Sequence, residues 1–216
     1  MHNEYNNIQL LSCLDEKNIQ HYLLIMRYRI AIGSDHGGFP LKEVLIRYLQ
    51  SLGHEIKDCG CYSPAPYDFP ISARAVAHAV MTKSVDRGIV IDGAGSPSAI
   101  VANKFPGIRA SVVHDEFTAK ISREHSDSNV LAFGVKCVSE DLAKTLVELW
   151  LRIDFLGGKY QKRIDMITEV EKETKDVQPK KRFVTARDIE ANQKIELGPD
   201  VLLTPLAQEL FKSKSK

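Results

Sequence analysis

The stretch that decides the fold is residues 30–53, IAIGSDHGGFPLKEVLIRYLQSLG. Ile30–Gly33 is a short apolar run that predicts a buried strand, and a polar, glycine-rich turn follows it. From Pro40 to Leu52 the apolar residues recur three and four positions apart, which is the spacing of a helix that packs through one face. Proline suits the first turn of a helix, and Gly53 suits its end. The stretch therefore predicts a strand, a tight turn and a helix in immediate succession.

The alternation of strand and helix continues along the chain, with one amphipathic segment between successive apolar runs. This order is typical of a parallel sheet covered by helices on both faces, with functional residues at the carboxyl ends of the strands. We therefore predict an α/β fold with a doubly wound parallel sheet. Further strands are expected at Glu55–Asp58, Arg87–Asp92, Ile108–Val113 and Val130–Phe133, and further helices at Ile71–Thr82, Ser98–Asn103, Glu116–His125 and Ser139–Asp154.

The two ends of the chain differ from this central part. Residues 1–26 have loosely helical apolar spacing, which predicts either a docking helix or an extension from an upstream start codon. The main domain is predicted to span 27–171, because 172–183 is mostly polar or charged and is typical of a linker. A small C-terminal extension is predicted over 184–216. Within it we expect a helix capped by Thr185 and Asp188, a strand at Lys194–Leu197, a turn at Gly198–Asp200 and a helix beginning at Thr204-Pro205.

The composition argues against several classes of function. The net charge of +1 lacks the basic excess of a nucleic-acid-binding protein, and no apolar run approaches the ~20 residues of a membrane span. Charged residues near the amino end interrupt any signal peptide. The four cysteines have no paired spacing typical of a metal site. We therefore expect a cytoplasmic protein with reduced thiols and with no metal or organic cofactor.

Polar residues follow two of the predicted strands, at the edge where a site is expected. Asp35 and His36 come after the first strand and form an acid–base pair on a turn whose backbone N–H groups can bind an anion. Asp92 ends the third strand, and a Gly-x-Gly loop then opens a helix. The N–H groups of that loop can hold a phosphate or an enediolate oxygen. The loop residues predicted to contact a ligand are Gly93, Ala94, Gly95, Ser96 and Ser98.

A second group of polar residues lies later in the chain. His125 and Ser126 belong to a polar segment that precedes the last predicted strand. A histidine in such a place is more often structural, but in company with His36 it is a candidate acid. Lys159 and Arg163 are four residues apart, so one helix face would hold both. Two cations at that spacing can bind a phosphate dianion, although a solvated surface is the default interpretation of such a pair.

Together these segments resemble the type B ribose-5-phosphate isomerase family, which includes the two galactose-6-phosphate isomerase subunits. The resemblance runs from about Tyr28 to Glu171. It rests on GSDHGGF at 33–39, ANKFPGIR at 102–109, SREH at 122–125 and NVLAFG at 129–134, which occur in the right order. The resemblance implies a Rossmann-like domain that forms homodimers or homotetramers, with active sites at the dimer interface.

The resemblance also implies roles for the matching residues. Asp35 and His36 would contact the sugar, and His125 would assist ring opening or donate a proton. Lys159 and Arg163 would lie near the phosphate. The loop from 93 to 98 would line the reacting end of the substrate.

The chain departs from the family pattern at some of these positions. Many members have a catalytic cysteine where this chain has Asp92, and a second group instead uses a glutamate at the position of Ser98. One galactose-6-phosphate isomerase subunit is similar in having aspartate at the Asp92 position, and it is thought to work with a partner that keeps the cysteine. Ala94, Pro97, Ser126 and Lys159 replace a threonine, a glycine, an asparagine and an arginine of the family.

Two interpretations of Asp92 are open. In the preferred one, Asp92 is the base that moves a proton between C1 and C2 through a cis-enediolate, as carboxylates do in other isomerases. In the other, Asp92 only orders its loop, and the chain is a weak enzyme or a subunit that needs a partner.

The substrate predicted first is ribose 5-phosphate, which would be converted to ribulose 5-phosphate. A tetrose or hexose phosphate is the alternative, because Ala94, Pro97 and Ser126 change the loop that would contact the sugar. A sugar-phosphate-binding or scaffold subunit without turnover is the non-enzymatic alternative. The C-terminal extension resembles extensions of bacterial microcompartment enzymes, which implies microcompartment enzymes or the shell as partners.

Overall fold

The structure is a computed structural model that describes residues 27–176, 182–191 and 201–214. The chain divides into two compact units at Thr168–Glu169. The predictions for residues 1–26, for a strand at Lys194–Leu197 and for a turn at Gly198–Asp200 fall outside the described residues.

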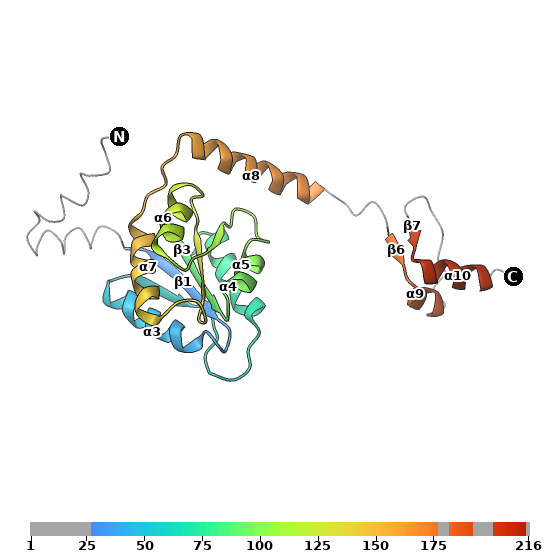
Figure 1. Ribbon diagram of the computed structural model, residues 1–216, viewed down its shortest axis with the longest axis horizontal. Coiled ribbons are helices and arrows are strands. Elements are labelled where there is room, and N and C mark those ends of the chain that lie inside the picture. The colour runs from blue at the N-terminus through green and yellow to red at the C-terminus, as the bar shows by residue number, and fades with distance from the viewer. Residues whose placement is uncertain (1–26, 177–181, 192–200, 215–216) are drawn as a thin grey trace, which may run out of the picture. The chain divides into compact units, whose positions relative to one another are not determined.

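The larger unit is built on a five-stranded sheet in the order β2-β1-β3-β5-β4. All neighbouring strands in it are parallel, which confirms the predicted doubly wound α/β fold (Figure 1). The strands are β1 (Arg29–Ser34), β2 (Glu55–Asp58), β3 (Arg87–Asp92), β4 (Ala110–Val112) and β5 (Val130–Gly134).

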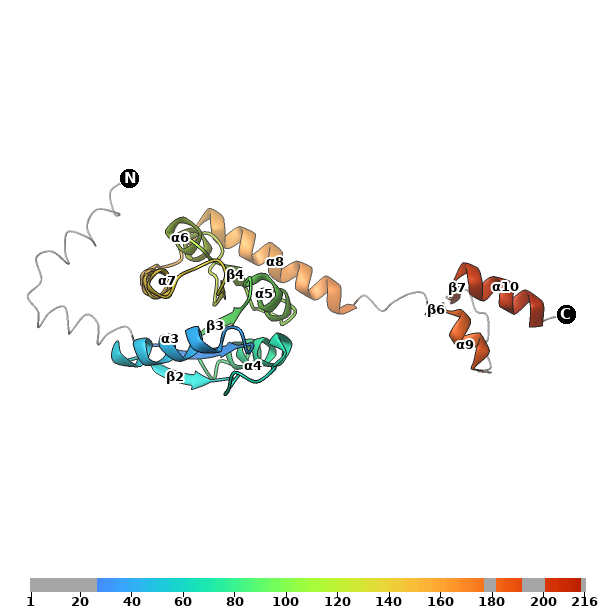
Figure 2. The same ribbon diagram turned by 60° about the horizontal axis from the view of Figure 1, so that its bottom comes forward.

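Helices cover both faces of this sheet (Figures 1 and 2). Successive strand residues point to opposite faces, so Ile30 and Ile32 join one core cluster and Ala31 joins the other. The first cluster packs under α3 (Phe39–Ser51), α6 (Glu116–Glu124) and α7 (Glu140–Arg152), and the second under α4 (Phe69–Met81) and α5 (Ser96–Ala102).

Local sequence explains where the helices begin. Proline occupies the first turn of α3, α4 and α5, as expected for a residue whose missing N–H would have no helical partner there. Asp115 caps α6, and its carboxylate accepts a hydrogen bond from the Thr118 N–H at 2.7 Å. The Ser139 hydroxyl caps α7 in the same way.

The buried cation Lys42 ties α3 to the end of β2. Its side chain is fully buried, and its Nζ lies 2.6 Å from Asp58 Oδ2 and 2.8 Å from Glu43 Oε1. Burial lowers the pKa of Lys42, but the hydrogen bonds to the two carboxylates outweigh it and leave the pKa above its ordinary value. Asp58 in turn accepts the Gly60 N–H, and the Gly60 carbonyl accepts the Ser34 N–H at 2.7 Å. The ammonium group therefore supports the backbone at the end of β1.

Lys42→Met is expected to lower the free energy of unfolding by about 1–2 kcal/mol, because Asp58 loses its cation inside the fold. The effect stays modest because the Asp58 side chain is 32% exposed and water partly replaces the ammonium. Urea unfolding measures the change. The control is Lys144→Met, which removes a surface pair with Glu140 and is expected to cost less than about 0.5 kcal/mol. Equal losses in the two variants would contradict a special role for Lys42.

The C-terminal part of the chain differs from its prediction in two ways. Helix α8 (Lys159–Asp176) continues past residue 172, where the charged composition predicted a linker. Two strands that were not predicted, β6 (Arg182–Val184) and β7 (Val201–Leu203), pair in parallel. The predicted helices are present as α9 (Ala186–Glu190) and α10 (Pro205–Lys214). The core of this unit consists of Val184, Ile189 and Ala207, with Val201, Leu203, Leu210 and Phe211 packed around them.

No helix among the described residues is both long enough and apolar enough to cross a bilayer.

Candidate active site

The turn that carries Asp35 and His36 lies against the end of β3. The Asp35 N–H donates to the Ile91 carbonyl at 3.1 Å, and the Asp35 carboxylate accepts the Gly38 N–H at 2.7 Å. A Cβ on Gly38 would come within 2.7 Å of the Ile91 carbonyl oxygen, so this close approach requires glycine. From β1 the chain passes to β2 on one side, while β3 lies on the other. Doubly wound sheets bind ligands at this switch point.

His36 is exposed, and its ring is held by the backbone of Tyr67. Nδ1 lies 3.2 Å from the Tyr67 carbonyl oxygen and 3.4 Å from the Tyr67 nitrogen. A tautomer with its proton on Nδ1 donates to this carbonyl and keeps Nε2 as a proton acceptor. Tyr67 was not among the predicted site residues, because a backbone carbonyl is common to every residue type and gives no sequence signal.

Asp92 is enclosed by its own loop. Its side chain is almost fully buried, with the residue 1% exposed. Oδ1 accepts the N–H groups of Ala94 (2.8 Å) and Gly95 (2.6 Å), and Oδ2 accepts the N–H of Ser98 (2.7 Å). The sequence predicted that the N–H groups of this loop bind a phosphate or an enediolate oxygen. In the structure three of them bind the Asp92 carboxylate, so they are not directed at a substrate.

The end of β5 holds the same loop from the other side. The Val135 N–H donates to the Asp92 carbonyl at 2.9 Å, and the Lys136 N–H donates to the Gly93 carbonyl at 3.2 Å. A Cβ on Gly134 would lie 2.5 Å from the Ala94 carbonyl carbon, so loop and strand are in direct backbone contact. Of the other predicted loop residues, Ala94 and Ser96 are exposed, Gly93 is half-buried, and Gly95 and Ser98 are buried.

The second group of predicted residues gathers around Tyr160. His125 follows the last residue of α6, and its ring stacks on the Tyr160 ring with centroids 4.0 Å apart and planes inclined by 13°. The Lys159 ammonium lies 5.0 Å and the Arg163 guanidinium 5.3 Å from the centre of the same ring. The four-residue spacing of Lys159 and Arg163 predicted that the two cations lie together, whereas Tyr160, which joins them to the histidine, was not predicted.

Ser126 follows His125 in the chain, and its carbonyl accepts a hydrogen bond from Arg109 Nε at 2.8 Å. Within the part of the chain that the structure describes, hydrogen bonds and ring contacts hold the residues of both groups in place. None of them joins the Asp35, His36 and Asp92 group to the His125, Lys159 and Arg163 group. One chain therefore presents two separate half-sites.

The described residues contain no group of three or more His, Cys, Asp or Glu side chains placed to hold a metal ion. Cys59, Cys61 and Cys137, the cysteines that the structure describes, are free thiols.

The sequence relatives are sugar-phosphate isomerases by name. The model of the Ribose/Galactose Isomerase family matches residues 30–167. Ribose-5-phosphate isomerase B of Escherichia coli K12 is 45% identical over 143 residues, which are 66% of this chain and 96% of that protein. Galactose-6-phosphate isomerase subunit LacA of Clostridium acetobutylicum is 38% identical over 143 residues, 66% of this chain and 99% of that protein.

Solved structures agree with the fold described above. Ribose-5-phosphate isomerase B of Clostridium thermocellum superposes with a TM-score of 0.67 at 44% identity, covering 68% of this chain and 99% of that one. The Mycoplasma genitalium enzyme with bound ribulose-5-phosphate gives a TM-score of 0.65 at 37% identity, covering 67% and 97%. The chain belongs to the Ribose/Galactose Isomerase family and is an aldose–ketose isomerase of sugar phosphates.

Proposed function

We propose that the chain interconverts ribose 5-phosphate and ribulose 5-phosphate through a cis-enediolate, without a metal or organic cofactor. The observation that carries the proposal is the group around Tyr160, where one histidine and two cations converge on one ring. A phosphate dianion suits the cations, and an imidazole beside them suits proton transfer to the sugar that the phosphate anchors. The E. coli and C. thermocellum relatives, which are named for ribose 5-phosphate, support this choice of substrate.

The reaction needs three tasks from the protein. Lys159 and Arg163 hold the phosphate, and His125 protonates the ring oxygen while the C1 hydroxyl loses its proton, which opens the ring. Asp92 is proposed as the base that removes the C2 proton, after which the electron pair forms the C1–C2 double bond and O1 takes the negative charge of the enediolate. The base returns the proton to C1, and the O2 hydroxyl gives its proton to O1, which leaves a ketone at C2 and a hydroxyl at C1. Asp35 and His36 contact the open-chain sugar, and the loop of residues 93–98 lines its C1 and C2.

The complete site is proposed to form between two subunits of a homodimer, or between pairs of subunits in a homotetramer. The separation of the two half-sites within one chain supports this arrangement. Large apolar side chains on the helices around the sheet also support it, because Ile71, Ile100 and Phe117 are 54%, 62% and 71% exposed. A two-fold interface would bring the His36 half of one subunit to the His125 half of its partner.

Mixed dimers test the shared site. His36→Ala and His125→Ala homodimers are each expected to be nearly inactive. If the variants are unfolded and refolded together, half of the dimers are mixed, and each mixed dimer contains one intact site and one doubly substituted site. Activity is then expected to return to about a quarter of the wild-type value, since half of the dimers are mixed and only one of the two sites in each mixed dimer is intact. Mixtures that stay as inactive as the parents would place the site within one chain.

A second candidate is a weak or partner-dependent isomerase subunit. The observation that favours it is the Asp92 carboxylate, which is buried and accepts three backbone N–H groups of its own loop. A side chain so engaged suits the ordering of a loop better than attack on a carbon-bound proton. The relative named LacA also leaves a hexose phosphate open as the substrate.

Exchange of the C2 proton in deuterated water separates these candidates, because it reports enediolate formation even when net turnover is slow. Purified protein is incubated in turn with pentose, tetrose and hexose phosphates. The fastest exchange is expected with ribose 5-phosphate. Faster exchange with a hexose 6-phosphate would identify that sugar, rather than ribose 5-phosphate, as the substrate. No exchange with any sugar phosphate would favour the partner-dependent subunit.

The C-terminal extension is proposed to direct the enzyme to a bacterial microcompartment. Its small core supports a docking role, because two short strands with three buried apolar residues among those that the structure describes give little stability alone. Deleting residues 180–216 is expected to keep isomerase activity and to abolish co-purification with shell or enclosed enzymes. Unchanged co-purification and unchanged oligomer size would end this proposal.

A further inference from the structure

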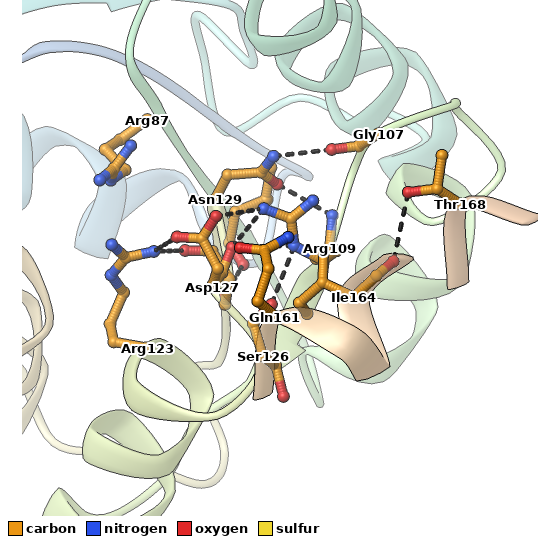
Figure 3. Close-up of polar contacts among 12 residues, drawn as sticks. Arg87, Gly107, Arg109, Arg123, Ser126, Asp127, Asn129, Gln161, Ile164 and Thr168 are labelled. Carbon is orange, nitrogen blue, oxygen red and sulfur yellow. Dashed lines mark hydrogen bonds and ion pairs between the residues drawn. The ribbon is translucent and has the colours of Figure 1, made fainter. Parts of the chain in front are cut away.

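The backbone immediately after His125 is held by two arginines (Figure 3). Arg109, which precedes β4, donates from Nε to the Ser126 carbonyl at 2.8 Å. Its Nη2 donates to both the carbonyl (2.7 Å) and the carboxylate (2.6 Å) of Asp127. From the other side, Arg123 Nη1 donates to the Asp127 carboxylate at 2.8 Å and to the Ser128 carbonyl at 2.6 Å. The Asp127 carboxylate is thus a bridge between two guanidinium groups.

Asp127 needs this support because its backbone is left-handed, with φ of 42°. Side chains with a Cβ rarely adopt that conformation, and it persists where the surroundings enforce it. The bonds from Arg109 and Arg123 fix both the peptide and the side chain of the residue. The His125 N–H donates to the Ile121 carbonyl at 3.0 Å, so the helical path of α6 reaches His125 and the left-handed turn follows two residues later.

Arg109 is anchored to the end of α5, the helix that begins at the Asp92 loop. Asn103, which follows α5, exchanges two hydrogen bonds with the Ala110 backbone, at 2.7 and 2.9 Å. The Asn129 side chain accepts the Arg109 N–H and donates to the Gly107 carbonyl, as Figure 3 shows. Arg109 therefore stands on a fixed backbone rather than on a free loop. A rigid base lets its guanidinium group hold the Ser126–Asp127 peptide in one position.

We infer that Asp127 and Arg109 are positioning residues for His125. They hold the turn that presents the imidazole flat against Tyr160, next to Lys159 and Arg163, and neither residue needs to touch the substrate. Relaxation of Asp127 to an ordinary φ would turn the chain in another direction after Ser126 and move the ring off Tyr160. The expected effect on catalysis rests on the proposed function, in which His125 opens the sugar ring. The placement of the His125 imidazole on Tyr160 does not depend on that function.

The test compares substitutions that separate charge from backbone conformation. Asp127→Ala removes the carboxylate and disfavours the left-handed backbone. Asp127→Asn keeps an acceptor and tolerates that backbone. Arg109→Lys keeps a cation but loses the fork that binds the Ser126 and Asp127 carbonyls together. The matched control is Lys83→Ala, because Lys83 is also left-handed, with φ of 56°, and lies outside both half-sites.

Two measurements are made on the full-length protein. The first is kcat and KM for ribose 5-phosphate across pH. The second is the NMR chemical shift of the His125 ring protons, which stacking on Tyr160 displaces, and it requires no substrate. Asp127→Ala is expected to lower kcat about thirtyfold with KM changed less than about threefold, and to abolish the ring shift. Arg109→Lys is expected to lower kcat roughly tenfold, and Asp127→Asn less than about fivefold.

The outcomes distinguish failure of the positioning inference from failure of the proposed isomerase function. Loss of the ring shift in Asp127→Ala, but not in Lys83→Ala, supports the positioning of His125 by Asp127. This holds even if the wild-type protein has no isomerase activity, because absent activity would overturn only the proposed function. Retention of the ring shift in Asp127→Ala and Arg109→Lys overturns the inference, whatever happens to kcat. If Asp127→Ala fails to fold, Arg109→Lys decides in the same way, because it keeps the positive charge beside Asp127.

Discussion

Asp92→Asn is expected to lower the free energy of unfolding by about 2 kcal/mol and to slow C2 proton exchange roughly a hundredfold. Asparagine keeps one oxygen, which can still accept the Ala94 and Gly95 N–H groups. Its NH2 group then faces the Ser98 N–H, so two donors meet where the carboxylate now accepts at 2.7 Å. The site is almost fully buried, and water therefore does not relieve this mismatch.

Urea unfolding and exchange in deuterated water measure the two effects. The control is Asp115→Asn, which changes an exposed carboxylate that also accepts a backbone N–H at a helix start. That variant is expected to lose up to about 1 kcal/mol and to exchange normally. Exchange within tenfold of wild type in Asp92→Asn would remove Asp92 from the role of base. Unchanged stability would contradict its role in ordering the loop.

Asp92→Cys distinguishes the two interpretations of Asp92, because it introduces the family's thiol and removes the acceptor of three N–H groups. Stability is expected to fall further than in Asp92→Asn. If Asp92 is the base, exchange in the cysteine variant stays at or below the wild-type rate. If Asp92 only orders the loop, the new thiol supplies a base that the chain lacks, and exchange exceeds the wild-type rate.

Gly134→Ala is the second substitution with a large expected effect. The added methyl group would lie 2.5 Å from the carbonyl carbon of Ala94 and 2.7 Å from its Cα, so the loop over Asp92 must move. Backbone cannot rotate away as a side chain can, and we expect a loss of about 3 kcal/mol in the free energy of unfolding. Exchange of the C2 proton is expected to fall at least tenfold, because the moved loop carries the reacting end of the site.

The control for Gly134→Ala is Gly93→Ala in the same loop, where no atom lies within 4 Å of the added methyl group. Thermal and urea unfolding of that variant are expected to match the wild type within about 0.5 kcal/mol. A Gly134→Ala protein as stable as Gly93→Ala would show that the contact between β5 and the loop is loose.

The sequence predicted the sheet well where apolar runs are bounded by turns. The bounds of β2 and β3 match the prediction, whereas β4 is shorter than the predicted Ile108–Val113. The Arg109 N–H donates to the Asn129 side chain, and the Ile108 N–H closes a turn onto Phe105, so neither enters the strand. In the C-terminal unit, β6 and β7 were missed because each has three residues and charged composition dominates the segment before β6.

Residue types in the sequence predicted which residues belong to the site. They predicted less well which of these residues contact one another. Lys159 and Arg163 could be paired from their spacing alone, since helix geometry relates residues four apart. No such rule relates His125 to Tyr160, because β5 and α7 lie between them in the sequence. The enclosure of Asp92 depends on the path of the loop backbone, which glycine permits but does not specify.

The order of the strands in the sheet also constrains when the protein can fold during synthesis. β4 leaves the ribosome before β5, yet β5 is its neighbour in the five-stranded sheet. Residues 110–112 therefore lack their strand partner until residues 130–134 have left the ribosome. A nascent chain halted between these two strands would expose its apolar segments, and such a chain is the kind that chaperones retain.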